Sequence, residues 1–177
     1  MECEMSRQTA GRRALLLAAC AAVAAIAAGS NQPERLQAGF YLIGAEAPSA
    51  DALPAPNSEQ LIVRYDRKYL LDSANEPPSY LLLPRRPDVA LRLAKPPAIE
   101  KGSNGFAELR LELTKEAAVD LERVSREHLG QAVSLVVDGE VITKHKIRSA
   151  ITGGQFRLSR CTDNACQYIL GRLVGGQ

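Results

Sequence analysis

The stretch that decides the fold is residues 107–160, AELRLELTKEAAVDLERVSREHLGQAVSLVVDGEVITKHKIRSAITGGQFRLSR. Its first segment alternates leucine with charged residues, which is the period-two pattern of a strand with one buried face and one face in water. We therefore expect a half-exposed antiparallel strand that buries Leu109, Leu111 and Leu113.

A helix is predicted directly after this strand. Thr114 is a suitable N-cap, and Glu116 favours the positive end of a helix. Apolar residues then recur at helical spacing, with a histidine in the last turn: Ala117, Leu121, Val124 and His128. Gly130 is expected to end the helix as its C′ residue.

A β-hairpin is predicted after the helix. Residues 132–137 are largely apolar, and Asp138-Gly139 follows them as a dipeptide suited to a tight primed turn. Residues 140–143 then provide the second strand. These strands, with the helix laid across them, are the expected core of the domain.

The C-terminal part completes the predicted domain. Gly153-Gly154 marks a turn, and Phe156 and Leu158 share one face of the strand that follows. The last helix is expected to bury an apolar stripe formed by Ala165, Ile169, Leu170, Leu173 and Val174. The predicted fold class is α+β, a small antiparallel sheet packed against two helices in the order strand, helix, hairpin, strand, helix.

Two cysteines, Cys161 and Cys166, lie at the start of the last helix, whereas Cys3 and Cys20 belong to the N-terminal leader. An even pair in an oxidising compartment favours a disulfide bond, which would hold the turn between strand and helix. The spacing is not C-x-x-C and no histidine lies nearby to complete a zinc site. A structural disulfide is therefore favoured over a redox or metal role.

The N-terminus predicts export. Three arginines precede residues 14–28, a stretch of Ala, Leu, Val, Ile and one Cys that is followed by small residues. Residues 1–29 are therefore expected to be a signal peptide. Two alternatives stay open, an uncleaved anchor formed by residues 14–28 and a lipoprotein in which Cys20 is lipidated.

Residues 30–104 are expected to contribute peripheral strands and proline-rich connections to the core. Residues 40–43 predict a short strand, whereas residues 45–58 are rich in Ala and Pro and predict a loop. The α+β domain itself is expected to occupy residues 105–177.

A second hairpin is predicted in this N-terminal part. Leu61, Val63 and Tyr65 alternate with other residues, and residues 69–71 follow as the expected partner strand. Prolines between residues 72 and 98 exclude long helices there and favour extended connections, because proline fixes φ and lacks a donor.

The composition excludes several function classes. The net charge of the 177-residue chain is +2, so no broad basic surface for nucleic acid is expected. The two histidines, His128 and His145, have no metal-ligand spacing, and Asp138 is explained by the hairpin turn. The serines have no nucleophile-elbow context. We therefore expect a protein that is not an enzyme and needs no cofactor or metal.

A basic segment follows the hairpin, formed by Lys144, His145, Lys146 and Arg148. One interpretation is a small solvated basic strand. The other is a binding site for an acidic peptide or an anionic lipid.

Four groups of residues in this part of the chain form a recognisable set. They are Leu111-x-Leu113-Thr114 with Ala117-Ala118, His128-Leu129-Gly130, Val136-Val137-Asp138-Gly139 and Ile151-x-Gly153-Gly154. Together they resemble the periplasmic head subdomain of the protein-translocation subunit SecD, or fused SecDF, over about residues 105–174 and more loosely over residues 40–71. The resemblance implies structural roles for Thr114, Gly130, Asp138, Gly139, Gly153 and Gly154. Where the family often has proline after the hairpin, this chain has His145.

In the SecD family the head belongs to a large periplasmic loop of a multi-spanning membrane protein. That protein helps to pull secreted polypeptides across the inner membrane with the proton gradient, and its head is thought to contact the emerging chain. This chain shows no set of transmembrane helices with the charged groups that couple to protons, so we expect that it is not a translocase by itself.

The resemblance implies an exported, non-catalytic module of the periplasm or cell envelope that binds polypeptide or protein and is linked to protein translocation. The expected partner is an unfolded or secreted polypeptide, or an envelope protein, with membrane association through the N-terminus if that segment is retained. An extended chain adding a strand to an exposed sheet edge is the expected mechanism. The alternative is a structural or interaction protein of the envelope with one fixed partner, and a third class is an enzyme inhibitor or peptidase-associated module.

Overall fold

The computed structural model describes residues 35–69, 76–102, 105–159 and 163–175, and residues Gln32–Gln177 form one compact unit. Before residue 105 the elements are β1 (Gly39–Leu42), β2 (Ala45–Ala47), η1 (Ala50–Ala52), β3 (Gln60–Tyr65), β4 (Ser79–Pro84), β5 (Val89–Ala90) and β6 (Ala98–Lys101). After it they are β7 (Ala107–Glu112), α1 (Lys115–Glu127), β8 (Ala132–Val137), β9 (Glu140–Lys146), β10 (Gln155–Leu158) and α2 (Asp163–Gly175).

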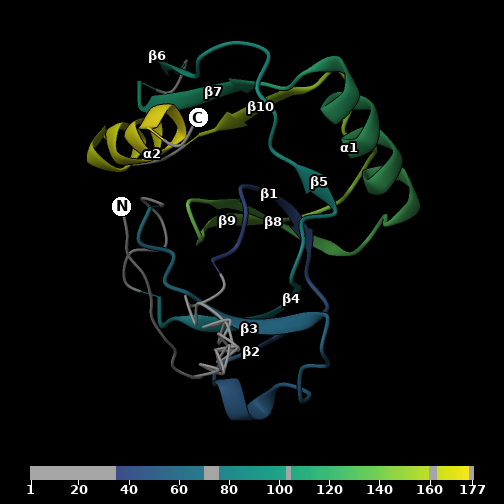
Figure 1. Ribbon diagram of the computed structural model, residues 1–177. Helices are drawn as coiled ribbons and strands as arrows, with labels where there is room; N and C mark the ends of the chain where they lie inside the picture. Colours follow the sequence, from purple (N-terminus) through teal and green to yellow (C-terminus); the bar gives the residue numbers. More distant parts are fainter. Residues whose placement is uncertain (1–34, 70–75, 103–104, 160–162, 176–177) are drawn as a thin grey trace, which may run out of the picture. The chain divides into compact units, whose positions relative to one another are not determined.

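The strands form three antiparallel sheets (Figure 1). The central sheet has the order β5-β1-β8-β9, the β7 sheet has the order β10-β7-β6, and the β4 sheet has the order β2-β4-β3. Two helices accompany them, so the predicted α+β class is confirmed. The order strand, helix, hairpin, strand, helix is also found, as β7, α1, β8–β9, β10 and α2.

Apolar side chains cover both faces of the central sheet. Leu135 of β8 belongs to a cluster shared with the β7 sheet and both helices, whereas the adjacent Val136 belongs to a second cluster shared with the β4 sheet. Successive residues of a strand point to opposite faces, so a strand buried on both sides needs a continuous apolar run. The run Val133–Val137, with Ser134 as its one polar member, is buried throughout.

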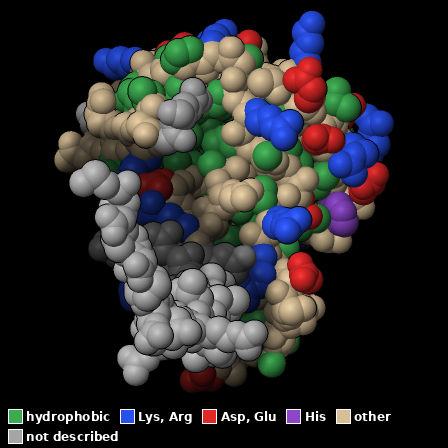
Figure 2. Space-filling view, in the orientation of Figure 1, with side chains coloured by type: hydrophobic (Ala, Val, Ile, Leu, Met, Phe, Trp, Pro, Cys, Tyr) green, Lys and Arg blue, Asp and Glu red, His purple; other side chains and the backbone are tan. Residues whose placement is uncertain are grey.

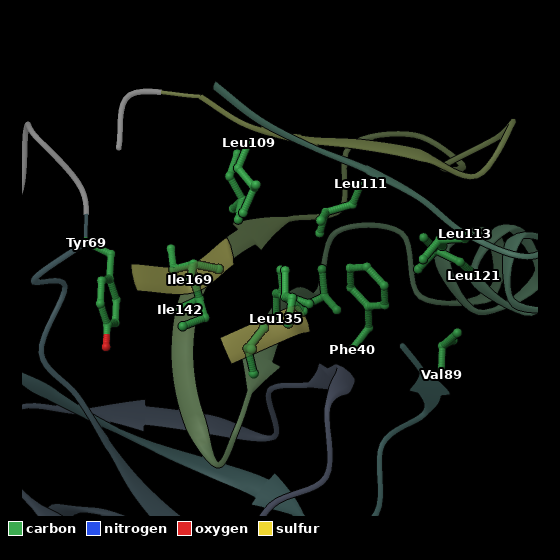
Figure 3. Close-up of a cluster of buried hydrophobic side chains, with 14 of the residues drawn as sticks. Phe40, Tyr69, Val89, Leu109, Leu111, Leu113, Leu121, Leu135, Ile142 and Ile169 are labelled. Atoms are coloured by element: carbon green, nitrogen blue, oxygen red, sulfur yellow. The ribbon is translucent and has the colours of Figure 1, made fainter. Parts of the chain in front are cut away.

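The larger cluster is built on β7. In Figure 3, Leu109 and Leu111 of β7 point toward side chains of the central sheet, among them Ile142 and Phe40. Both leucines are fully buried, as their alternation with charged residues predicts. Burying one such side chain stabilises the fold by about 2 kcal/mol.

The helix after β7 begins as predicted and ends earlier than predicted. The Thr114 side chain accepts a hydrogen bond from the backbone N–H of Ala117 at 3.3 Å, which makes it the N-cap. A C′ position for Gly130 predicts Leu129 as the C-cap, whereas the observed C-cap is His128. Gly130 has a φ of +86°, and its N–H donates to the carbonyl of Ile147 instead of to a helix carbonyl. This bond joins the helix end to the chain that follows β9.

The predicted β8–β9 hairpin and its turn are present. Asp138 and Gly139 both have positive φ, +49° and +81°, as a primed turn requires. The second strand continues to Lys146, three residues beyond the prediction, because Val133 and Ala132 still pair with His145 and Lys146. The basic segment is therefore mostly strand.

The N-terminal strands are more deeply integrated than predicted. β1 lies inside the central sheet between β5 and β8, and Phe40 and Tyr41 are buried on its opposite faces, so this strand is not peripheral. The loop predicted for residues 45–58 contains β2 and η1. Burial of Phe40 and Tyr41 explains why β1 joins the central sheet, whereas β2 and η1 contain no buried residue.

The strand partner predicted for residues 61–65 was wrong. β3 pairs over six residues with β4, which lies in the segment expected to form extended connections. Leu81 and Leu83 of β4 are fully buried in the second cluster, and this burial explains the pairing. Residues 70–71 of the predicted partner lie outside the described residues.

The predicted stripe of α2 is largely buried. Ala165, Ile169 and Leu173 are in the larger cluster, whereas Val174 is 57% exposed, so that member of the stripe was wrong. Cys166 is also fully buried there. Cys161 lies outside the described residues, so its pairing with Cys166 stays a prediction. The same holds for residues 1–29 and their signal peptide, anchor or lipidated Cys20.

Candidate functional site

The basic segment borders a groove of about 210 Å³, which we call the β9–β10 groove. Its buried lining comes from Phe40 of β1, from Val133, Ser134 and Leu135 of β8 and from Ile147 after β9. This lining is apolar except for the Ser134 hydroxyl, which donates to the carbonyl of Tyr41. Its exposed lining includes the cationic side chains of Lys146 and Arg148. The groove thus joins an apolar interior to a basic rim.

Part of the groove wall is formed by the loop between β9 and β10, which α1 holds in place. Ile151 lines the groove, and its backbone N–H donates to the Ser125 hydroxyl of α1 at 2.8 Å. Ser125 is 1% exposed and itself donates to the carbonyl of Glu122, so both of its hydrogen-bonding roles are used. This contact holds the loop between β9 and β10 against the helix.

The turn after this loop depends on two glycines. Gly153 and Gly154 have φ of +77° and +64°, a region that glycine adopts without strain. A Cβ on Gly154 would lie 2.7 Å from the Cβ of Ala118, so no larger residue fits against α1. The turn directs β10, and with it Phe156, toward the groove.

An aromatic corner closes one side of the groove. The rings of Phe40 and Phe156 meet edge to face, with centroids 5.5 Å apart. The His145 ring lies 6.2 Å from Phe156, and its Nε2 is 3.1 Å from the Thr143 hydroxyl oxygen. Desolvation lowers the pKa of the His145 imidazole. The contacts orient this ring along the groove.

The structure brings together three of the four basic residues predicted for binding. His145, Lys146 and Arg148 all line the groove. Lys144 does not, because its ammonium group pairs with the carboxylate of Glu46 and lies 5.9 Å from the centre of the Tyr65 ring. The role of the other three as ligands stays a prediction.

The residues with predicted structural roles are spread around this groove. Thr114 caps α1, Gly130 and the Gly153-Gly154 pair shape its two connections, and Asp138-Gly139 forms the far end of the hairpin. Sequence reasoning missed Ser125 as a contact to the groove wall and missed the pairing of Phe40 with Phe156. Neither carries a local signal, since the partners are 26 and 116 residues apart.

A second cavity of about 240 Å³ lies at the other end of the hairpin, next to Asp138 and Arg172. There the Asp138 carboxylate pairs with Arg172 of α2 and, at 2.9 Å, with Arg35. Its charged groups are therefore matched within the chain. The β9–β10 groove is the better candidate because no carboxylate in the described part of the chain pairs with its Lys146 or Arg148.

The described residues contain neither a helix that could span a membrane nor a cluster of metal-binding side chains. Neither α1 nor α2 is long and apolar enough to span a bilayer. No cluster of three or more His, Cys, Asp or Glu side chains that could hold a metal ion occurs in the described part of the chain.

The comparison with known proteins points to one family. Residues 88–167 match the family model of the SecDF P1 head subdomain. The protein translocase subunit SecDF of Thermus thermophilus is 43% identical over 51 residues, which are 29% of this chain and 7% of that protein.

Solved structures of SecDF are also similar to parts of the chain. A membrane component SecDF that enhances protein export shares 34% identity at a TM-score of 0.39, over 45% of this chain and 36% of that one. SecDF in a super-membrane-facing form shares 19% identity at a TM-score of 0.45, over 75% of this chain and 18% of that one. SecDF from Thermus thermophilus, a translocon-associated membrane protein, shares 15% identity at a TM-score of 0.39, over 77% and 29%.

The chain therefore spans only a small part of each relative that it matches, 7% of the curated protein and at most 36% of these solved chains. The match to the family model begins at residue 88, before the boundary at residue 105 that the sequence motifs indicated, and it includes β6 and the hairpin. The resemblance drawn from those motifs is thus confirmed, since residues 88–167 are similar to the SecDF P1 head subdomain.

Proposed function

We propose that the β9–β10 groove binds short stretches of unfolded polypeptide and that the protein is a non-catalytic accessory of protein translocation in the bacterial envelope. The observation that carries this proposal is the groove itself, whose apolar interior and basic rim come mostly from residues within the head-type subdomain. A protein with this function is exported, and residues 1–29 then serve as its signal peptide or membrane anchor.

The size of the groove supports a polypeptide ligand. At about 210 Å³ it is smaller than the 300–1,000 Å³ of typical small-molecule pockets, and it suits one or two side chains of a longer chain. An extended chain can offer one side chain after another to such a groove. Recognition of this kind tolerates many sequences.

The strands beside the groove support the same ligand. β9 is an edge strand of the central sheet, and β10 is an edge strand of the β7 sheet. An edge strand has a backbone side without a neighbouring strand, and an extended chain can add to it through main-chain hydrogen bonds. Such bonds add affinity without requiring a particular sequence.

The first test measures fluorescence anisotropy of several unrelated, labelled, unfolded peptides titrated with the purified protein. We expect micromolar binding to most of them. Ile151→Ser removes apolar surface from the groove and should weaken binding about fivefold, which corresponds to about 1 kcal/mol of lost apolar contact. Val119→Ser is the matched control, because Val119 is 66% exposed on α1 and does not line the groove.

The outcomes separate this function from the alternative. Binding that is weakened by Ile151→Ser and unchanged by Val119→Ser supports the proposal. If no peptide binds while one folded envelope protein is captured in a saturable manner, the protein is an interaction module with a fixed partner. Equal affinities for both variants would place peptide binding outside the β9–β10 groove.

A further inference from the structure

Many of the Lys and Arg side chains in the described residues are paired with carboxylates. On the face shown in Figure 2, Lys and Arg side chains lie among Asp and Glu side chains. On α1, for example, Arg123 pairs with Asp120 and Glu127, both at 3.5 Å. Most of the charge on that helix is thus neutralised by neighbours.

The rim cations lack such neighbours. No carboxylate of the described residues forms an ion pair with Lys146 or Arg148, although Lys144 on the same strand is paired with Glu46. Lys146 and Arg148 are exposed, and both line the β9–β10 groove. A carboxylate brought to this rim would therefore meet two cations without displacing an existing partner.

The apolar interior strengthens this effect. A segment whose apolar side chain contacts Phe40, Leu135 and Phe156 excludes water from the groove, and a charge pair at its edge is then less screened than a fully exposed pair. The His145 ring beside them packs at an angle against Phe156, with the ring centroids 6.2 Å apart, and adds aromatic surface at the edge of the groove. An apolar residue and a nearby carboxylate would thus bind cooperatively.

We propose that the β9–β10 groove prefers polypeptide segments in which a carboxylate lies within two residues of a large apolar side chain. The apolar side chain enters the groove, and the carboxylate pairs with Lys146 and Arg148. This specificity rests on the proposed polypeptide-binding function. The size of the groove favours a peptide over an anionic lipid, because the groove holds one or two side chains and not the acyl chains of a phospholipid.

The test compares three labelled peptides that share a Leu-rich sequence and differ at two positions next to the leucines. These positions hold Asp and Glu, Asn and Gln, or two lysines. We expect the acidic peptide to bind about three- to tenfold more tightly than the amide peptide, and the basic peptide to bind most weakly. The difference should shrink as the salt concentration rises, since exposed pairs are screened.

The double variant Lys146→Glu with Arg148→Glu should abolish or reverse the preference for the acidic peptide over the amide peptide. Lys101→Glu is the control, because Lys101 is exposed on β6, at the edge of the β7 sheet farthest from β10. Thermal unfolding of each variant verifies that it is folded. All substituted positions are exposed, so little loss of stability is expected.

Each outcome bears on one of the two proposals. Equal binding of all three peptides overturns the charge preference and leaves the polypeptide-binding function standing. Absence of binding to any peptide overturns both. Retention of the preference in the double variant excludes Lys146 and Arg148 as its source. Binding to phosphatidylglycerol vesicles that the double variant loses, without any preference among the peptides, would assign the rim to lipid.

Discussion

At the scale of single residues, Glu46 stands out because three elements meet at its carboxylate. Lys144 of β9 pairs with it, and Arg67, which follows β3, lies 3.6 Å away. Burial alone would raise the pKa of Glu46, but the hydrogen bond and charge of Lys144 and the charge of Arg67 hold it below its ordinary value. The cluster links the central sheet to the β4 sheet.

A pH dependence follows from the lowered pKa of Glu46. A carboxyl whose pKa is lower in the folded state stabilises the fold above its ordinary pKa of 4.5, and this contribution is lost as the pH falls through the folded value. Glu46→Gln should lower the free energy of unfolding by about 1 kcal/mol at pH 7, and the difference from the wild type should shrink as the pH falls below 4.5. Urea unfolding across this pH range measures both.

The control for this prediction is Glu100→Gln. The Glu100 carboxylate pairs with Arg110 at 3.2 Å but is 50% exposed, so its loss should have little effect at any pH. A constant difference between Glu46→Gln and the wild type from pH 7 to pH 3 would contradict the proposed ion pairing.

At the scale of elements, α1 serves both stability and the groove. Its N-cap, Thr114, satisfies a backbone N–H within the helix. Its buried Ser125 instead reaches out of the helix and holds the backbone of Ile151 in the groove wall. Each of these two hydroxyl groups accepts a hydrogen bond from a backbone N–H, but only the bond to Ser125 fixes the groove wall.

Two alanine variants distinguish these roles. Thr114→Ala should lower the free energy of unfolding by about 1 kcal/mol and leave peptide affinity unchanged. Ser125→Ala should cost about 1–2 kcal/mol, because it leaves the N–H of Ile151 without its partner, and should also weaken peptide binding by loosening the wall. Thermal unfolding and peptide anisotropy measured on both variants test this. Equal peptide affinities of the two variants would show that Ser125 has no role in shaping the groove.

At the scale of the whole molecule, the central sheet organises the described part of the chain. Its two faces are covered by different apolar clusters, so neither the β7 sheet nor the β4 sheet could bury its apolar face without it. β8 is its most protected strand, flanked by β1 and β9 and buried along nearly its whole length.

Hydrogen exchange should reflect this arrangement. The amides of β8 should exchange only through global unfolding and be the slowest of the chain, since every route to solvent breaks a neighbouring strand or an apolar cluster. The amides of β6, an exposed edge strand, serve as the internal comparison and should exchange faster. Exchange in β8 as fast as in β6 would show that the sheets separate from one another without global unfolding.

The elements of residues 105–175 could be predicted from the sequence because their signals are local. The alternation of Leu109 and Leu111, the capping hydroxyl of Thr114 and the Asp138-Gly139 turn each act within a few residues. The motifs that resemble the SecDF head lie in the same segments, so this similarity was also accessible from the sequence. Two of the rim residues, Lys146 and Arg148, were within the basic segment that the sequence singled out.

Only the tertiary structure decided how these elements combine. The sequence by itself determined the strand and helix periodicities, the turns and the charge of the rim, since these depend on neighbours along the chain. The insertion of β1 between β5 and β8, the pairing of β3 with β4 and the contact of Phe40 with Phe156 depend on partners far away in sequence. These pairings form because they bury apolar surface on both faces of the central sheet, and no local pattern specifies which distant partner achieves that.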